Sequence, residues 1–278
     1  MKVRFLPFLM ALLGLSLSAP AFLVAAKKPT VEEIIEKHLK GLTAGDPAEM
    51  TKPKAAVGQV KMKVITGSGE VQGKVQLVSA PDYLQLKMAY PDPNYKWDGF
   101  TLRQDKEIIP EQITPNNYGF LADFFYTNKD IVRSGFVGGV DSSAWPFLQK
   151  DRKVDCDFDG EEKVDGDKTY KLKCKVNSLI TATLYFDQKS YRLLQTVYRI
   201  PPTPQMSTDM GDVDKSSQRT DKGNAILTSR FKDYNKVGDH EFAARWLMDL
   251  EYRGEGSLEV KWEIVFQNVV PVTLNAGQ

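Results

Sequence analysis

Few side chains of this chain could do chemistry, and their spacing assembles no familiar site. The 278 residues include only two histidines, His38 and His240, and two cysteines. His240 follows Asp239, a pairing that hydrolases use to orient a base, but no serine or cysteine nucleophile can be tied to it. So few imidazoles and thiols do not make a zinc site. We expect no enzymatic activity, no metal and no other cofactor, and keep a hydrolase as the third hypothesis.

The charge balance argues against a polyanionic partner. The chain holds 37 lysines and arginines and 36 aspartates and glutamates, a formal net charge of +1. Nucleic-acid binding usually needs a basic patch, and a phosphate-binding glycine loop leads from a strand into a helix. The glycine cluster at 135–139 follows a helical stretch instead, which is typical of a sharp turn. We therefore expect no nucleic-acid partner.

Residues 1–26 are typical of a secretory signal peptide. Lys2 and Arg4 precede an apolar run over residues 5–17, and small residues follow it. The run is shorter than the roughly 20 residues that span a bilayer. We expect cleavage after Ala21 or Ala26, and prefer Ala26 because polar residues begin directly after it. Cleavage removes two cations and no acid, so the mature chain has a net charge of −1. We expect it in the periplasm, without a transmembrane segment.

The two cysteines are predicted to form a disulfide, because an exported protein with an even cysteine count normally pairs them. A three-residue hairpin loop over 164–166 would place its glycine in the left-handed position of a bulge turn. Lys163 then lies opposite Asp167, and Cys156 lies opposite Cys174. The cysteines fall at a non-hydrogen-bonded pair, where side chains approach most closely. We expect the disulfide to staple this hairpin.

The remaining pattern predicts one short helix followed by many strands. Thr30 and Glu33 form a capping box, and the apolar period predicts a helix over 30–42 with His38 packed on its buried face. From residue 57 onward, apolar residues mostly alternate with polar ones. This pattern predicts an α+β fold, with a single curved antiparallel sheet of about ten or eleven strands. We expect the sheet to be a half-open β-barrel, with short helices covering its concave face.

The strands are interrupted once by an aromatic-rich helical segment and once by a polar stretch. Residues 115–150 carry phenylalanines at helical spacing and are predicted to form a helical lid. Residues 201–224 are too rich in Pro, Ser, Thr, Asp and Gly to pack, and are predicted to be a flexible loop. No linker is visible, so we expect residues 27–278 to form one domain.

Several stretches resemble the outer-membrane lipoprotein carrier and lipoprotein-sorting superfamily. The stretches are 29–39, 75–84, Trp97-Asp98-Gly99, Tyr185-Phe186-Asp187 and 231–239. The resemblance implies a periplasmic half-barrel with a helical lid, whose hydrophobic cavity accepts acyl chains without catalysis or a cofactor. It also implies an arginine that locks the lid, for which Arg103 and Arg133 are the candidates by location.

The main hypothesis is a periplasmic, non-enzymatic carrier of lipid or lipoprotein acyl chains. Its cavity is predicted to be lined by Met62, Leu86, Met88, Trp97, Trp262 and Phe266 from the strands, and by Phe120, Phe124, Phe125 and Trp145 from the lid.

The alternative is a protein-interaction or envelope-stress sensor module on the same half-barrel. Its edge strands, or the loop at 201–224, would contact an envelope membrane protein. A dry, continuous gap between sheet and helices favours the carrier. A tightly packed interior with an exposed apolar edge favours the interaction module.

Overall fold

The computed structural model describes residues 28–272, apart from residues 66–68, 104–106, 116, 150–151, 202–223 and 254–256. The predicted signal peptide lies outside the described residues, and so does nearly all of the polar loop predicted at 201–224. Among the helices that are described, none has the length and hydropathy needed to cross a membrane.

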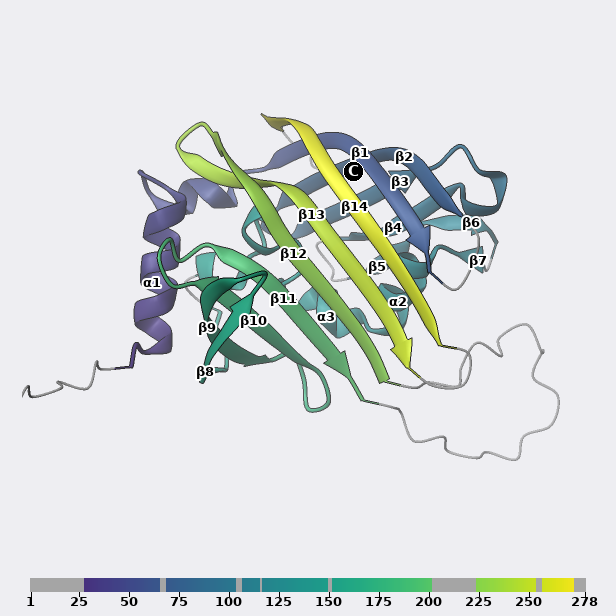
Figure 1. Ribbon diagram of the computed structural model, residues 1–278. Coiled ribbons are helices and arrows are strands. Elements are labelled where there is room, and N and C mark those ends of the chain that lie inside the picture. Colours follow the sequence, from purple (N-terminus) through teal and green to yellow (C-terminus); the bar gives the residue numbers. More distant parts are fainter. Residues whose placement is uncertain are drawn as a thin grey trace, which may run out of the picture.

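In the described part of the chain, twelve strands form one antiparallel sheet, where about ten or eleven were predicted. Their order is β5-β4-β3-β2-β1-β14-β13-β12-β11-β10-β9-β8, so the first and last strands of the chain pair in the middle of the sheet. The edge strands β5 and β8 do not pair with each other, and the sheet stays open (Figure 1). This confirms the predicted α+β fold with a half-open sheet. The strands are β1 Lys54–Val64, β2 Glu70–Ala80, β3 Tyr83–Ala89, β4 Trp97–Leu102, β5 Ile108–Pro110, β8 Cys156–Val164, β9 Asp167–Lys175, β10 Thr181–Asp187, β11 Leu193–Ile200, β12 Asn224–Val237, β13 His240–Arg253 and β14 Leu258–Pro271.

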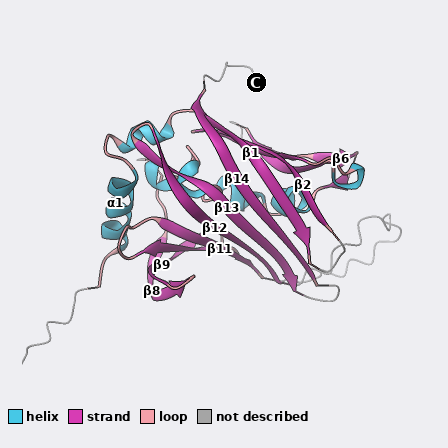
Figure 2. Ribbon diagram, turned by 45° about the horizontal axis from the view of Figure 1, so that its top comes forward, coloured by secondary structure: helices cyan, strands magenta, loops and turns pink. Residues whose placement is uncertain are grey.

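Short helices cover one face of this sheet. Between β5 and β8 the chain forms a small hairpin and a run of short helical turns, which lie behind the strands in Figures 1 and 2. We call this run, residues 119–149, the helical cover. The longest helix, α1, stands beside the β8–β12 half of the sheet (Figure 1). The elements are α1 Val31–Leu42, η1 Pro47–Thr51, η2 Pro93–Tyr95, the hairpin β6 Gln112–Thr114 and β7 Asn117–Tyr118, α2 Phe120–Thr127, α3 Lys129–Arg133, η3 Gly139–Asp141 and η4 Pro146–Leu148.

Helix α1 forms as predicted. The Glu33 amide donates to the Thr30 hydroxyl at 3.2 Å, and the Thr30 amide donates to the Glu33 carboxylate at 3.0 Å, which completes the capping box. Its buried face presents Ile34, His38 and Leu42 to the sheet. The helix therefore closes one end of the half-barrel.

The disulfide is confirmed, but the turn that was predicted to set its register is wrong. Cys156 and Cys174 are bonded, with their Cα atoms 4.0 Å apart. The loop has two residues instead of three, because Val164 pairs with Asp167. A bulge then places Asp159 and Gly160 opposite a single residue of β9, and this one-residue shift restores the cysteine pairing. Gly160 adopts a left-handed φ of 98°, which explains why a glycine occupies the bulge.

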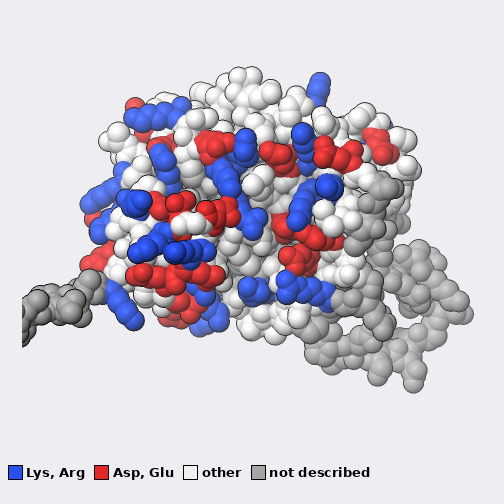
Figure 3. Space-filling view, in the orientation of Figure 1, with Lys and Arg blue, Asp and Glu red and all other residues white. Residues whose placement is uncertain are grey.

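The outer face of the sheet carries charges of both signs. In Figure 3, lysines and arginines alternate with aspartates and glutamates across the strands, without a large patch of one sign on the face in view. Charged side chains on this face form ion pairs between neighbouring strands: Arg245 lies 3.1 Å from Asp233 and 3.7 Å from Glu263, and Lys261 lies 3.5 Å from Asp249. This face is a solvated surface, in contrast to the apolar inner face.

Removing the disulfide should destabilise the protein. The bond closes a loop with a sequence separation of 18 residues, and a loop of this size is worth about 3 kcal/mol of unfolding free energy. We expect the double variant C156S/C174S to lose that amount in urea denaturation. Thiol counting by mass spectrometry on periplasmic material should find no free cysteine in the wild type. Two free thiols, or an unchanged denaturation midpoint, would contradict the staple.

Candidate functional site between the sheet and the helical cover

Most of the predicted cavity residues meet in one core between the sheet and the helical cover. Eight of the ten are between 0 and 5% exposed and belong to a single cluster of packed apolar side chains. Phe120 packs against the same cluster, is partly buried, and stacks on Tyr95 at a ring distance of 5.2 Å. The eight are Met62, Leu86, Met88, Phe124, Phe125, Trp145, Trp262 and Phe266.

Trp97 does not join them. In β4 the residues that face the core are Asp98 and Phe100, and a strand turns successive side chains to opposite faces. Trp97 therefore lies on the outer face, where the ammonium of Lys87 sits 4.6 Å from its ring centre. The prediction that Trp97 points into the interior is not met by this geometry.

The interior is filled by these side chains. A residue that lined an open cavity would keep measurable exposure, whereas the core aromatics pack edge to face on one another. Phe100 and Phe125 have ring centres 4.7 Å apart, and Trp246 and Phe266 have theirs 5.2 Å apart. An acyl chain can enter only if part of this packing moves aside.

The two edges of the sheet differ: β5 is the apolar but largely buried segment Ile108–Pro110, whereas β8 is charged. The edge strand β8 carries four exposed carboxylates, at Asp157, Asp159, Glu161 and Glu162. Charges on an edge strand oppose pairing with another chain. The structure thus shows the packed interior that was expected of an interaction module, while its β8 edge is charged and its apolar β5 edge is largely buried.

Asp98 attaches helix α2 to the sheet. One carboxylate oxygen accepts from the amides of Gly99 and Ala122, both at 2.8 Å, and the other accepts from the amide of Leu121 at 3.3 Å. The N-cap residue of α2 is Gly119, which has no side chain to cap the helix. Asp98 therefore caps the helix from a neighbouring strand and ties the helical cover to β4.

Asp141 and Ser143 make the second and third attachments. The Asp141 carboxylate accepts from the amide of Ala243 at 3.0 Å and from the indole N–H of Trp246 at 2.8 Å, both on β13. The amide of Ser143 donates to the Ser79 hydroxyl on β2 at 2.6 Å. The helical cover is thus held at three separate strands by buried hydrogen bonds. We call Asp98, Asp141 and Ser79 the three anchors.

Burial changes the acidity of the two anchor carboxyls. Desolvation raises the pKa of Asp98 to about 6, against the opposing effect of its three N–H donors. Desolvation also raises the pKa of Asp141, while Trp246, Ala243 and the buried ammonium of Lys54 oppose the rise. Both carboxylates therefore carry a cost of ionisation that a surface aspartate does not.

His38 packs in the core, as the sequence predicted. Its ring lies edge to face on Phe186 at 4.8 Å and on Trp145 at 6.2 Å. Nδ1 lies 2.7 Å from the carbonyl oxygen of Tyr191, and a carbonyl can only accept, so Nδ1 carries the proton. Burial lowers the pKa of His38 to about 4, so the ring is neutral near pH 7.

The other residues singled out from the sequence do not assemble into a catalytic or locking site. The carbonyl of Arg133 accepts from Arg152 at 2.6 Å, and Arg103 is exposed, so neither makes one of the three anchors. His240 is half-buried, and the nearby ammonium of Lys54 adds to desolvation in lowering its pKa. Among the described residues, no group of His, Cys, Asp and Glu could hold a metal ion.

Sequence reasoning missed the anchors because an aspartate within a strand looks like a turn or a surface charge. One signal was present at Asp98. It shares the strand face of Phe100, so a regular β4 would bury both together. Asp141 and Ser143 carried no such signal, because their partners lie on strands remote in the sequence.

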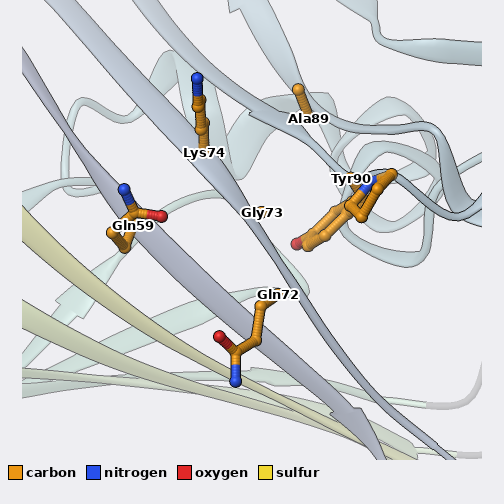
Figure 4. Close-up of a pocket in the computed structure, with 7 residues that line it drawn as sticks. Gln59, Gln72, Gly73, Lys74, Ala89 and Tyr90 are labelled. Carbon is orange, nitrogen blue, oxygen red and sulfur yellow. The ribbon is translucent and has the colours of Figure 1, made fainter.

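A surface recess lies outside this packed core. It is an open groove of about 390 Å³ between β1, β2 and the end of β3, lined by Gln59, Gln72, Gly73, Lys74, Ala89, Tyr90 and Pro91 (Figure 4). It forms because the pairing of β2 with β3 begins only at Lys74 and Ala89. Tyr90 separates the groove from the core, since its hydroxyl lies 3.5 Å from the sulfur of Met88.

No family model and no curated protein matches this sequence. Solved structures with a similar chain course were found. A LolA superfamily protein from Nitrosomonas europaea aligns over 89% of this chain and 96% of its own, at 10% identity and a TM-score of 0.46. A putative outer membrane lipoprotein-sorting protein domain from Vibrio parahaemolyticus aligns over 85% and 90%, at 11% identity and 0.42. A DUF1329 family protein from Desulfovibrio piger aligns over 90% and 95%, at 13% identity and 0.38.

The first two of these proteins belong to the superfamily that the sequence resembles. Similarity at this level carries no assignment of function. The function is therefore argued below from the residues of this chain.

The raised pKa of Asp98 predicts a pH-dependent contribution to stability. The folded carboxyl binds its proton more tightly than the unfolded one, so its contribution to stability falls as pH rises from about 4 to about 6. D98N removes this titration. We expect the stability difference, wild type minus D98N, to decrease by about 2 kcal/mol between pH 4 and pH 7.

Urea denaturation of both proteins across that range measures the difference. All other titrating groups are shared, so their contributions largely cancel. A difference that stays constant with pH would show that Asp98 does not titrate in this window.

Proposed function

We propose that this chain is an exported, non-enzymatic protein of the periplasm that binds acyl chains of lipids or lipoproteins. The acyl chain lies between the inner face of the open sheet and the helical cover. One observation carries this proposal: a wide apolar interior is covered by a segment that buried hydrogen bonds hold at three separate strands.

The composition of the interior suits an unbranched apolar ligand. Met62, Met88 and the surrounding aromatic rings present surfaces without charge, and methionine adapts its shape to irregular partners. Each methylene that leaves water for such a surface contributes about 0.8 kcal/mol. An acyl chain thus gains binding free energy along its length without any catalytic group.

Because the interior is filled, binding requires the helical cover to move. Its middle contains three glycines with left-handed φ, at Gly135, Gly138 and Gly139. Gly135 and Gly138 lie between α3 and η3, and Gly139 begins η3, so the cover consists of short helical pieces joined through glycines. Breaking the anchors releases the cover, and the acyl chain then replaces aromatic side chains against the sheet.

A disulfide between the cover and the sheet tests whether the cover must open. The Ser143 amide lies 2.6 Å from the Ser79 hydroxyl, which brings these two residues close enough to cross-link. We expect oxidised S79C/S143C to take up at least about tenfold less of a fluorescent fatty acid than the wild type, because the cover cannot leave the sheet. Uptake should return on mild reduction.

The single variants S79C and S143C control for the substitutions, and reduced wild type controls for the native disulfide. Native mass spectrometry of the wild type purified from periplasm should show a bound lipid or lipopeptide. Uptake by the oxidised double variant equal to that of the wild type would contradict an opening cover. A folded wild type that binds no fatty acid and carries no lipid would contradict the carrier, and would favour the protein-interaction module.

A further inference from the structure

Four buried polar atoms near β10 and β11 have no hydrogen-bond partner among the described residues. They are His38 Nε2, Trp145 Nε1, Thr196 Oγ1 and the Tyr198 hydroxyl. Each of these residues is at most 1% exposed. Buried polar groups in native proteins are nearly always paired, so four unpaired atoms in one region call for an explanation.

These atoms follow one another along the inner face of the sheet. Thr196 pairs with Leu184 and Tyr198 with Ala182, so the two hydroxyls lie two residues apart on one face of β11, about 7 Å along the strand. Phe186 lies two residues beyond Leu184 on β10, and its ring packs edge to face against the ring of His38.

The His38 ring in turn contacts Trp145 of the helical cover. We call His38, Trp145, Thr196 and Tyr198 the polar row. It runs from α1 and the cover onto β11, and Trp145 also belongs to the proposed acyl-chain site.

The polar row offers donors and an acceptor together. Because His38 Nδ1 donates to the Tyr191 carbonyl, its Nε2 can only accept. The Trp145 N–H can only donate, and the hydroxyls of Thr196 and Tyr198 can do both. A hydrocarbon chain satisfies none of these groups. A hydroxyl oxygen satisfies either kind, since it both donates and accepts.

We propose that the polar row selects acyl chains that carry a hydroxyl group partway along their length. This inference rests on the proposed function and adds the chemical class of the chain that is bound. The hydroxyl group of the bound acyl chain forms hydrogen bonds with the buried polar atoms that otherwise have no partner. An unsubstituted acyl chain cannot form these hydrogen bonds.

Two fatty acids of equal length test the selection. We expect 12-hydroxyoctadecanoic acid to displace a dansyl-labelled fatty acid from the wild type at about fivefold lower concentration than octadecanoic acid. T196V and Y198F remove one hydroxyl each and should reduce this preference.

The opposite face of β10 supplies matched controls. Thr183 and Tyr185 lie on the outer face, where Tyr185 packs with Val197, and neither has an unpaired buried hydroxyl. T183V and Y185F make the same chemical changes as the test variants, and should keep the full preference for the hydroxylated acid.

A measurement without lipid separates the inference from the proposed function. Removing an unpaired buried hydroxyl should stabilise the protein, so T196V and Y198F should each raise the Tm by about 2 to 4 °C, while T183V and Y185F should not. A lower Tm in both test variants would show that the hydroxyls are already paired, and would overturn the inference.

The binding measurements also distinguish a failure of the inference from a failure of the proposed function. Equal affinity of the wild type for the two acids would overturn the polar row as a selector and leave the acyl-chain proposal standing. Displacement of the probe by neither acid would overturn the proposed function, and the polar row with it.

Discussion

An antiparallel sheet that curls without closing leaves one broad apolar face, and this face must be kept from water. The rest of the structure follows from that constraint. Helix α1 lies at one end of the sheet, and the helical cover, which interrupts the strands in the sequence, lies over the inner face. The pairing of β1 with β14 joins the two halves of the sheet at its centre. One continuous core then forms between strands that lie far apart in the sequence.

Hydrophobic burial alone does not fix where the helical cover sits on the sheet, because the hydrophobic effect is not directional. The hydrogen bonds of the three anchors fix its position and orientation. Asp98 fixes the start of α2 over β4, and Asp141 and Ser79 fix the later part of the cover over β13 and β2. Desolvation raises the pKa of both aspartates, so these anchors hold the cover with hydrogen bonds that cost free energy to bury. A cover held in this way sits in one place, and the proposed function requires that these hydrogen bonds break.

The polar row fits the same view of the interior. A core selected for stability alone would replace Thr196 and Tyr198 by valine and phenylalanine, because their hydroxyls find no partner among the described residues. Proteins commonly give up stability at functional sites. The anchors and the polar row are the polar parts of an otherwise apolar interior: the first position the cover, and the second confers a preference on what lies under it.

The sequence alone determined the local elements and their faces. The capping box of α1, the buried position of His38 and the alternation of the strands need only neighbouring residues, and the structure agrees with each. The cysteine pairing was predicted correctly through a compensating error, since the turn at Asp165 is one residue shorter and the bulge at Gly160 restores the register. The shorter turn shifts the strand register by one residue, and the bulge shifts it back by one residue. The spacing of the cysteines in the sequence reflects only this net register.

Tertiary structure decided how the cover meets the sheet. Asp98 is bound by residues 23 and 24 positions away, and Asp141 by residues 102 and 105 positions away. Apart from the strand face that Asp98 shares with Phe100, nothing in the local pattern distinguishes these aspartates from solvated ones. Trp97 is a different case, because alternation from Phe100 along a regular β4 already places it on the outer face. The sequence could state which residues avoid water, but only the fold states which buried polar groups find a partner, because that depends on chain segments that meet in space.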